Sequence, residues 1–192
     1  MSWETLFRSD DQAWRTPRWL FEQIHTVCAF DLDAAAHPDN ALCVSKYLTE
    51  EDDALSIEEW PGESVWLNPP YGRQVGKFVA KAREQAEVYG KTVVVLIFAR
   101  TDTRWWQDHA MEASAIFLIR GRLKFHKATG EKDAAPAPSA LLVFSQYGPV
   151  DVSFYRFDRT KPEEWKEQLR KHVTCWDPAR TRSSCPRTSP LL

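Results

Sequence analysis

The sequence predicts an α/β domain of three layers, in which helices cover both faces of a mostly parallel central sheet. Segments with strand character alternate along the chain with segments whose apolar residues recur at helical spacing, and this alternation is typical of βαβ units. The segment Thr92–Phe98 is almost entirely apolar, as expected of a central strand buried on both faces.

The first helix is expected to start at Thr16 and Pro17. A threonine can cap a helix, a proline fits its first turn, and apolar residues follow at helical spacing as far as Val27. The segments expected next are, in order, a short strand at residues 29–32, an acidic loop that contains D-L-D-A-A-A-H-P-D-N, a second acidic stretch at residues 50–60, a Pro-Gly turn at residues 61–62, and a buried strand at residues 65–67 that runs into N-P-P-Y.

The second half of the chain continues the alternation. Apolar residues at helical spacing predict a helix over Val75–Tyr89. The elements expected after the central strand are a helix at residues 103–113, a strand at Ala115–Ile119, a loop rich in Gly, Ala and Pro at residues 129–139, two strands near the sheet edge at Ser139–Phe144 and residues 150–157, and a closing helix at residues 161–173.

Length and composition predict one domain. The 192 residues suit a single core over residues 1–176, whereas residues 177–192 lack the apolar content to fold and are expected to be disordered. A formal net charge of −2 provides no overall attraction to nucleic acid, so such binding would need a local basic patch. The sequence contains no signal peptide, no apolar run of membrane-spanning length and no C-x-x-C pair. It is therefore interpreted as a cytoplasmic protein without a metal site, assumed to be a monomer.

Three polar clusters follow predicted strands: D-L-D-A-A-A-H, N-P-P-Y and A-R-T-D-T. Ligands of open α/β sheets bind at the carboxyl ends of the strands. The three clusters are therefore predicted to share one site.

The N-P-P-Y cluster suits catalysis on an amino group. The side-chain oxygen of Asn68 and the carbonyl of Pro69 can both accept hydrogen bonds from one NH₂, which withdraws its lone pair from ring conjugation. Tyr71 offers a ring on which a base can stack. An amine activated in this way needs an electrophile, and the sulfonium methyl of S-adenosyl-L-methionine is the candidate. The alternative interpretation of N-P-P-Y is a turn without a catalytic role, because proline cannot continue a strand.

The ordered set of motifs resembles the phage-type, Dam-like family of DNA N6-adenine methyltransferases. The motifs are W-R-T-P, F-D-L-D-A-A-A, D-D-A-L, W-L-N-P-P-Y-G, F-A-R-T-D-T-R-W-W and G-R-L-K-F, spread from Trp14 to Phe144. The resemblance implies a Rossmann-like class I methyltransferase fold. It also implies transfer of a methyl group from S-adenosyl-L-methionine to N6 of adenine in double-stranded DNA, as in phage DNA modification or restriction-modification.

The resemblance also assigns roles to residues. The catalytic residues would be Asn68, Pro69, Pro70 and Tyr71, and the cofactor-binding residues would be Thr16, Pro17, Asp33, Ala34 and Asp53. Thr16 and Pro17 would lie against the methionine part of the cofactor, and Asp53 would accept a hydrogen bond from its adenine amino group. One departure is clear: the usual G-x-G of the first motif is absent, and the Cβ atoms of D-L-D-A-A-A-H oppose a close backbone approach.

The target adenine would have to leave the duplex, since its amino group is paired and stacked there. Phosphate contacts are expected from the densest basic stretch and its surroundings, namely Arg100, Arg104, Arg120, Arg122, Lys124 and Lys127. Solvated charges on an amphipathic strand are the alternative for this stretch.

Other interpretations of the sequence remain open. Asp31, Asp33, His37 and Asp39 could form a metal-dependent hydrolase site, although loop acids and a helix cap explain them more simply. Asp53 could be one member of a solvated acidic run. The same fold could methylate cytosine N4, an RNA base or a protein glutamine, or it could be an inactive DNA-binding module.

Overall fold

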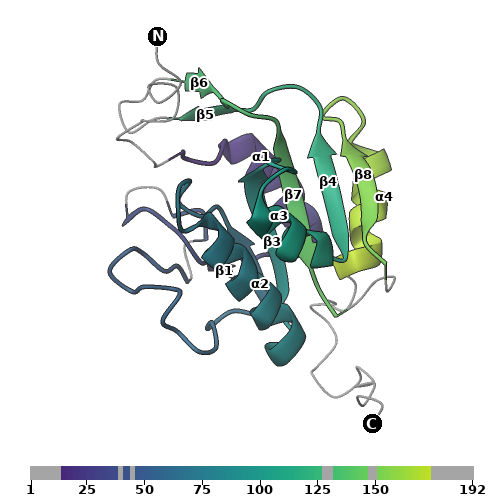
Figure 1. The fold of residues 1–192 in the computed structure, drawn as a ribbon. Coiled ribbons are helices and arrows are strands. Elements are labelled where there is room, and N and C mark those ends of the chain that lie inside the picture. The colour runs from purple at the N-terminus through teal and green to yellow at the C-terminus, as the bar shows by residue number, and fades with distance from the viewer. Residues whose placement is uncertain (1–13, 39–40, 44–45, 127–131, 147–150, 174–192) are drawn as a thin grey trace.

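The computed structural model describes residues 14–38, 41–43, 46–126, 132–146 and 151–173. A six-stranded sheet lies at the centre of this described part, with helices packed against it (Figure 1). The elements are, in chain order, α1 (Arg18–Cys28), β1 (Leu32–Asp33), β2 (Ser64–Leu67), α2 (Val75–Tyr89), β3 (Thr92–Phe98), α3 (Arg104–Asp108), the 3-10 helix η3 (Ala110–Glu112), β4 (Ala115–Ile119), β5 (Lys124–His126), β6 (Lys132–Ala134), β7 (Ser139–Phe144), β8 (Ser153–Phe157) and α4 (Pro162–Val173).

The sheet has the order β1-β2-β3-β7-β4-β8 and is mostly parallel, as predicted. Strands β1, β2 and β3 pair in parallel, and β4 pairs in parallel with β8. Strand β7 runs antiparallel to β3 on one side and to β4 on the other. Five strands therefore run in one direction, and their carboxyl ends lie at one edge of the sheet.

The helices form the two outer layers of the predicted three. Helices α1 and α4 pack with one core cluster on one face, and α2 and α3 pack with a second cluster on the other (Figure 1). Strand β3 contributes to both clusters, because successive side chains of a strand point to opposite faces. Val94 and Leu96 belong to the first cluster, and Val95 and Ile97 to the second.

The local patterns of α2 and β3 predicted the bounds of both elements, and the structure confirms them.

The start of the first helix was predicted wrongly. Helix α1 begins at Arg18, and Pro17 is its N-cap, with an extended backbone and no side-chain cap. The Pro17 carbonyl accepts from the backbone N–H groups of Leu20 and Phe21. Thr16 is buried and does not cap the helix.

Two strands of the sheet differ from their predictions, one in its bounds and the other in its position. The first strand comprises Leu32–Asp33 rather than residues 29–32, because Ala29 ends α1 in a left-handed conformation with φ 47°. Strand β7 lies in the middle of the sheet rather than near its edge, between β3 and β4. Its six residues are all buried, which is consistent with its almost continuously apolar sequence.

Two predicted segments also differ in their local structure. The loop predicted at residues 129–139 contains strand β6, which pairs antiparallel with β5 in a separate two-stranded sheet. The helix predicted at residues 103–113 is divided at His109 into α3 and η3. The predicted disordered tail, residues 177–192, lies outside the described residues.

Asp31 connects the amino ends of β1 and β2. Its carboxylate accepts from the backbone N–H groups of Glu63, at 3.0 and 3.2 Å, and of Ser64, at 2.9 Å. The backbone N–H of Asp31 donates to the Ser64 carbonyl at 2.8 Å. Gly62 lies against this contact, where an added Cβ would be 2.4 Å from the Leu32 Cβ. The role of Asp31 is therefore structural.

We expect Gly62→Ala to lower the free energy of unfolding by about 1–3 kcal/mol, because the new methyl group would force β1 away from β2. Urea unfolding of the variant and the wild type measures this change. Val88→Ala is the control, since Val88 is 67% exposed on α2 and its truncation should have little effect. A Gly62→Ala protein as stable as the control would contradict a close β1–β2 approach.

Candidate active site

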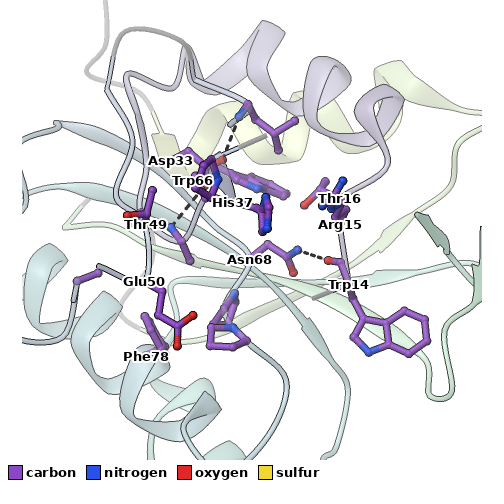
Figure 2. A pocket seen from close by; sticks show the side chains of 18 of the residues that line it. Trp14, Arg15, Thr16, Asp33, His37, Thr49, Glu50, Trp66, Asn68 and Phe78 are labelled. Carbon is purple, nitrogen blue, oxygen red and sulfur yellow. Dashed lines mark hydrogen bonds between the residues drawn. The ribbon is translucent and has the colours of Figure 1, made fainter. Parts of the chain in front are cut away.

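A pocket of about 630 Å³ lies at the carboxyl ends of β1 and β2 (Figure 2). Segments that are distant in the sequence form its wall: residues 14–16, 33–38, 49–51 and 53–55, Trp66, residues 68–70, and Gln74 and Phe78 of the α2 region. The pocket therefore joins D-L-D-A-A-A-H to N-P-P-Y, as predicted. The third polar cluster, A-R-T-D-T, follows β3 at the same sheet edge but is not part of the lining.

Asn68 follows the last residue of β2, and hydrogen bonds fix the orientation of its side-chain amide. Its Nδ2 donates to the backbone carbonyl of Trp14 at 2.6 Å (Figure 2). Its Oδ1 accepts from the Tyr71 hydroxyl at 3.0 Å. A carbonyl can only accept, so the amide nitrogen has to face Trp14. The amide oxygen retains a second lone pair for another donor.

Tyr71 supports Asn68 and belongs to an aromatic cluster. Its ring stacks on Phe98 with a centroid distance of 4.0 Å and an interplanar angle of 25°. Its hydroxyl also lies 3.2 Å from the Leu96 carbonyl, and burial raises its pKa. One face of the ring is thus covered by Phe98. Tyr71 is not part of the pocket lining, whereas Asn68, Pro69 and Pro70 are.

Asp33 places a buried carboxylate in the pocket wall. The side chain accepts from the backbone N–H groups of Leu42, at 3.1 Å, and Ala35, at 3.4 Å. Burial nevertheless raises the pKa of the Asp33 carboxyl to about 6, because the charged form is poorly solvated there. At neutral pH the Asp33 carboxyl is ionised and accepts hydrogen bonds, although burial of its charge costs free energy.

Three alanines lie in the segment that replaces the usual G-x-G of the family's first motif. Ala34, Ala35 and Ala36 line the pocket. The backbone N–H of Ala34 donates to the Trp66 carbonyl at 2.9 Å, and that of Ala36 to the Leu48 carbonyl at 2.8 Å. These two donors hold the loop against its neighbours and are therefore engaged within the protein.

Asp53 lies at the acidic side of the pocket and has an unusual backbone conformation. Its φ of 44° is left-handed, and its carbonyl accepts from both the backbone N–H and the hydroxyl of Ser56, each at 2.8 Å. Asp52 instead closes its own turn, accepting from the N–H and hydroxyl of Thr49 at 2.8 and 2.9 Å. Members of the acidic run therefore differ: Asp53 lines the pocket, and Asp52 does not.

Thr16 lines the pocket, whereas Pro17 caps α1 outside the lining. Sequence reasoning missed Trp14, Arg15, Trp66 and Phe78, which also line it. Strand alternation could have identified Trp66, since residues 66 and 68 point to the same side of β2. The side-chain nitrogens Nε of Arg15 and Nε1 of Trp66 are buried without a hydrogen-bond partner among the described residues. The pocket therefore has donors around Arg15 and acceptors around Glu50, on opposite sides in Figure 2.

The basic residues predicted to contact DNA lie outside the pocket. Arg104 is almost fully exposed on α3 and pairs with Asp108 at 3.2 Å, and Arg100, partly exposed, follows β3. Arg120 pairs with Asp158 at 2.7 Å. Arg122 donates to the Ala135 carbonyl at 3.1 Å, and Lys124 is exposed at the start of β5. Lys127 lies outside the described residues.

No group of three or more His, Cys, Asp or Glu side chains suited to a metal ion occurs in the described ranges. Asp31 is engaged with the backbone of β2, and Asp39 lies outside those ranges. None of the described helices is long and apolar enough to span a membrane.

Comparisons with known proteins point to one family. Residues 4–163 match the family model described as DNA N-6-adenine-methyltransferase (Dam). The chain is 33% identical over 163 residues to a DNA N-6-adenine-methyltransferase of Haemophilus phage HP1 (strain HP1c1), covering 80% of this chain and 92% of that protein. It is 35% identical over 113 residues to a DNA N-6-adenine-methyltransferase of Escherichia phage T1, covering 57% of this chain and 45% of that protein.

The raised pKa of Asp33 predicts a pH-dependent difference in stability between the wild type and Asp33→Asn. The folded-state pKa of about 6 lies above the unfolded value of 3.8, so the stabilising contribution of the protonated carboxyl is complete below the unfolded pKa and is lost as the pH rises through 6. The unfolding free energy of the wild type minus that of the variant should therefore fall by about 2 kcal/mol between about pH 4 and pH 7.5. Urea unfolding across this range measures it, and a pH-independent difference would contradict the assignment.

Proposed function

This chain belongs to the DNA N-6-adenine-methyltransferase family, and from that premise we propose that it transfers the methyl group of S-adenosyl-L-methionine to N6 of adenine in double-stranded DNA. The observation that carries the proposal is the fixed amide of Asn68, held by Trp14 and Tyr71 at the rim of the pocket. This amide presents an acceptor, and two consecutive prolines follow Asn68 in the chain.

Asn68 and Pro69 would act on the adenine amino group together. The free lone pair of Asn68 Oδ1 and the Pro69 carbonyl accept its two N–H bonds, which makes the nitrogen lone pair available as a nucleophile. When bound, S-adenosyl-L-methionine supplies a sulfonium methyl group that such a nitrogen can attack directly. The contribution of the protein is then positioning and electrostatics. Alkylation of the nitrogen would release S-adenosylhomocysteine as the leaving group, and the alkylated nitrogen would then lose one proton to water, so a strong general base beforehand is not required.

The polarity of the pocket supports the cofactor assignment. Asp33 and Asp53 are carboxylate acceptors suited to ribose hydroxyls and to an adenine amino group, and their charge is favourable for a sulfonium cation. Arg15 and Thr16 are suited to the methionine end, which carries a carboxylate. We assign Ala34 and Pro17 to the same binding region, Ala34 as part of the wall and Pro17 as the anchor of residues 14–16 on α1.

Double-stranded DNA would be held by a local basic surface. We assign phosphate contacts to Arg100, Arg104, Arg122 and Lys124, which belong to the segments that follow β3 and β4, at the same sheet edge as Asn68. Arg120 pairs with Asp158, whose side chain is only 6% exposed, so we assign it a structural role, whereas the ion pair of Arg104 with Asp108 is exposed on both sides. With a net charge of −2, binding should be modest and should weaken steeply with added salt.

A phage or prophage enzyme of this kind would meet its substrate in the cytoplasm of the bacterial host. Modification of phage DNA, including protection from restriction, is the biological role that we propose for it. We propose that it acts as a monomer. We also propose that Pro70 and Tyr71 complete the catalytic motif, Pro70 by fixing its backbone and Tyr71 by providing its aromatic support.

We expect Asn68→Ala to reduce methyl transfer by at least about a thousandfold, because it removes both an acceptor for N6 and the fixed amide. Tritiated S-adenosyl-L-methionine, unmethylated duplex DNA and nucleoside analysis measure the product. Binding of S-adenosylhomocysteine, measured by calorimetry, should be retained. Labelled N4-methylcytosine, or no labelled nucleoside from a wild type that binds the cofactor, would contradict the assignment.

Tyr71→Phe tests the support of Asn68 separately. The variant keeps the ring stacked on Phe98 and loses the hydroxyl that donates to Asn68 Oδ1. We expect kcat to fall roughly 5- to 10-fold, which corresponds to one neutral hydrogen bond, with cofactor affinity unchanged. A kcat equal to or above that of the wild type would mean that the hydroxyl competes with the substrate for Asn68.

A further inference from the structure

A buried glutamine of α2 holds the acidic loop that borders the pocket. Gln85 is fully buried, its Oε1 accepts from the backbone N–H of Trp60 at 2.8 Å, and its Nε2 donates to the carbonyl of Glu58 at 2.7 Å. Both ends of the amide are therefore satisfied by loop backbone, and the amide has only one acceptable orientation. A fully buried amide with two such bonds fixes the position of residues 58–60 on the helix.

Trp60 extends this anchor to the wall of the pocket. Its side chain is fully buried, and its indole Nε1 donates to the carbonyl of Ala54 at 2.8 Å. Ala54 is buried and lines the pocket, and the next residue towards the amino terminus is Asp53. A continuous series of hydrogen bonds thus leads from α2 through Trp60 to the carbonyl of Ala54, the residue that follows Asp53.

Asp53 has a left-handed backbone conformation, which the hydrogen bonds from Gln85 and Trp60 would help to maintain. A φ of 44° is uncommon for a residue with a Cβ, and it persists where surrounding contacts determine the backbone. Ser56 holds the Asp53 carbonyl on one side, and the Trp60 indole holds the Ala54 carbonyl on the other. Backbone strain of this kind is concentrated at ligand-binding positions.

We propose that Trp60 and Gln85 are positioning residues for recognition of the adenine of the cofactor, through the carboxylate of Asp53. This inference rests on the proposed function, in which Asp53 accepts from the adenine amino group. Neither Trp60 nor Gln85 lines the pocket, so neither touches the cofactor. Their effect is to hold the Asp53 carboxylate at a fixed position. A fixed acceptor lets the pocket distinguish a cofactor with an amino group on its base from one with an oxo group.

The test compares S-adenosylhomocysteine with its inosine counterpart, in which an oxo group replaces the adenine amino group. Calorimetry gives the two dissociation constants, and their ratio is the discrimination. For the wild type we expect a preference of about 10-fold or more for the adenine compound, because the oxo group would face the carboxylate acceptor against acceptor. Asp53→Asn should reduce this preference to about 3-fold or less.

Trp60→Phe retains an aromatic ring in the core and removes the N–H that bonds Ala54, together with part of the ring volume. We expect the preference to fall at least about 3-fold, and we expect no further fall when the change is added to Asp53→Asn, since both act through one carboxylate. Trp165→Phe is the matched control. That indole is equally buried, but its Nε1 has no partner among the described residues, so the preference should stay at the wild-type value.

Equal weakening of both ligands by Trp60→Phe, or an unchanged preference, would overturn the positioning role and leave a structural one. Additive losses in the double variant would overturn it as well. If circular dichroism finds Trp60→Phe unfolded, Gln85→Met provides the same test, because it loses both loop contacts at similar volume. A wild type that binds neither ligand would instead refute the proposed function. A wild type that binds both equally would refute the role of Asp53, and with it the positioning role of Trp60 and Gln85, and would leave the proposed methyl transfer intact.

Discussion

Burial of β2 on both faces is the constraint on which the candidate active site depends. All four residues of this strand are buried, between β1 and β3 in the sheet and between two helical layers. A strand in this position cannot shift by one residue without moving its side chains to the wrong face. The residue that follows it, Asn68, is therefore fixed at the sheet edge before any contact of its own is considered. The Asp31 carboxylate fixes the other end of the same strand.

Helix α2 gives the site a second rigid reference. Its amino-terminal half contributes Phe78 to the pocket, and its carboxyl-terminal half carries Gln85, which binds the acidic loop. The N-P-P-Y segment, residues 68–71, lies shortly before this helix in the chain. One helix therefore relates Asn68, the proposed acceptor for the substrate amine, to the acidic side of the pocket. A loop that would otherwise be a flexible insertion between β1 and β2 becomes part of the wall.

Sequence patterns predicted the parts of the molecule that local physics determines. The bounds of α2 and β3 follow from periodicity and apolar content, and the positions of Asp33 and Asn68 follow from the rule that polar residues after parallel strands meet. The contact between Asn68 and Trp14 joins residues 54 positions apart, and no local pattern encodes it. Gln85 and Trp60 look in the sequence like a surface amide and an ordinary core residue. The central place of β7 depends on antiparallel pairing with both neighbours, which its apolar sequence allows but does not specify.

The amide of Asn68 is oriented by a backbone carbonyl, that of Trp14, and this has a consequence for how the site tolerates change. A main-chain acceptor survives exchange of its own side chain, so position 14 can vary in identity, among large residues that preserve the aromatic packing, without loss of the contact. An inserted or deleted residue between Trp14 and the start of α1 would instead displace the acceptor. Sequence variation at this point is therefore constrained more by the number of residues between position 14 and α1 than by the identity of residue 14.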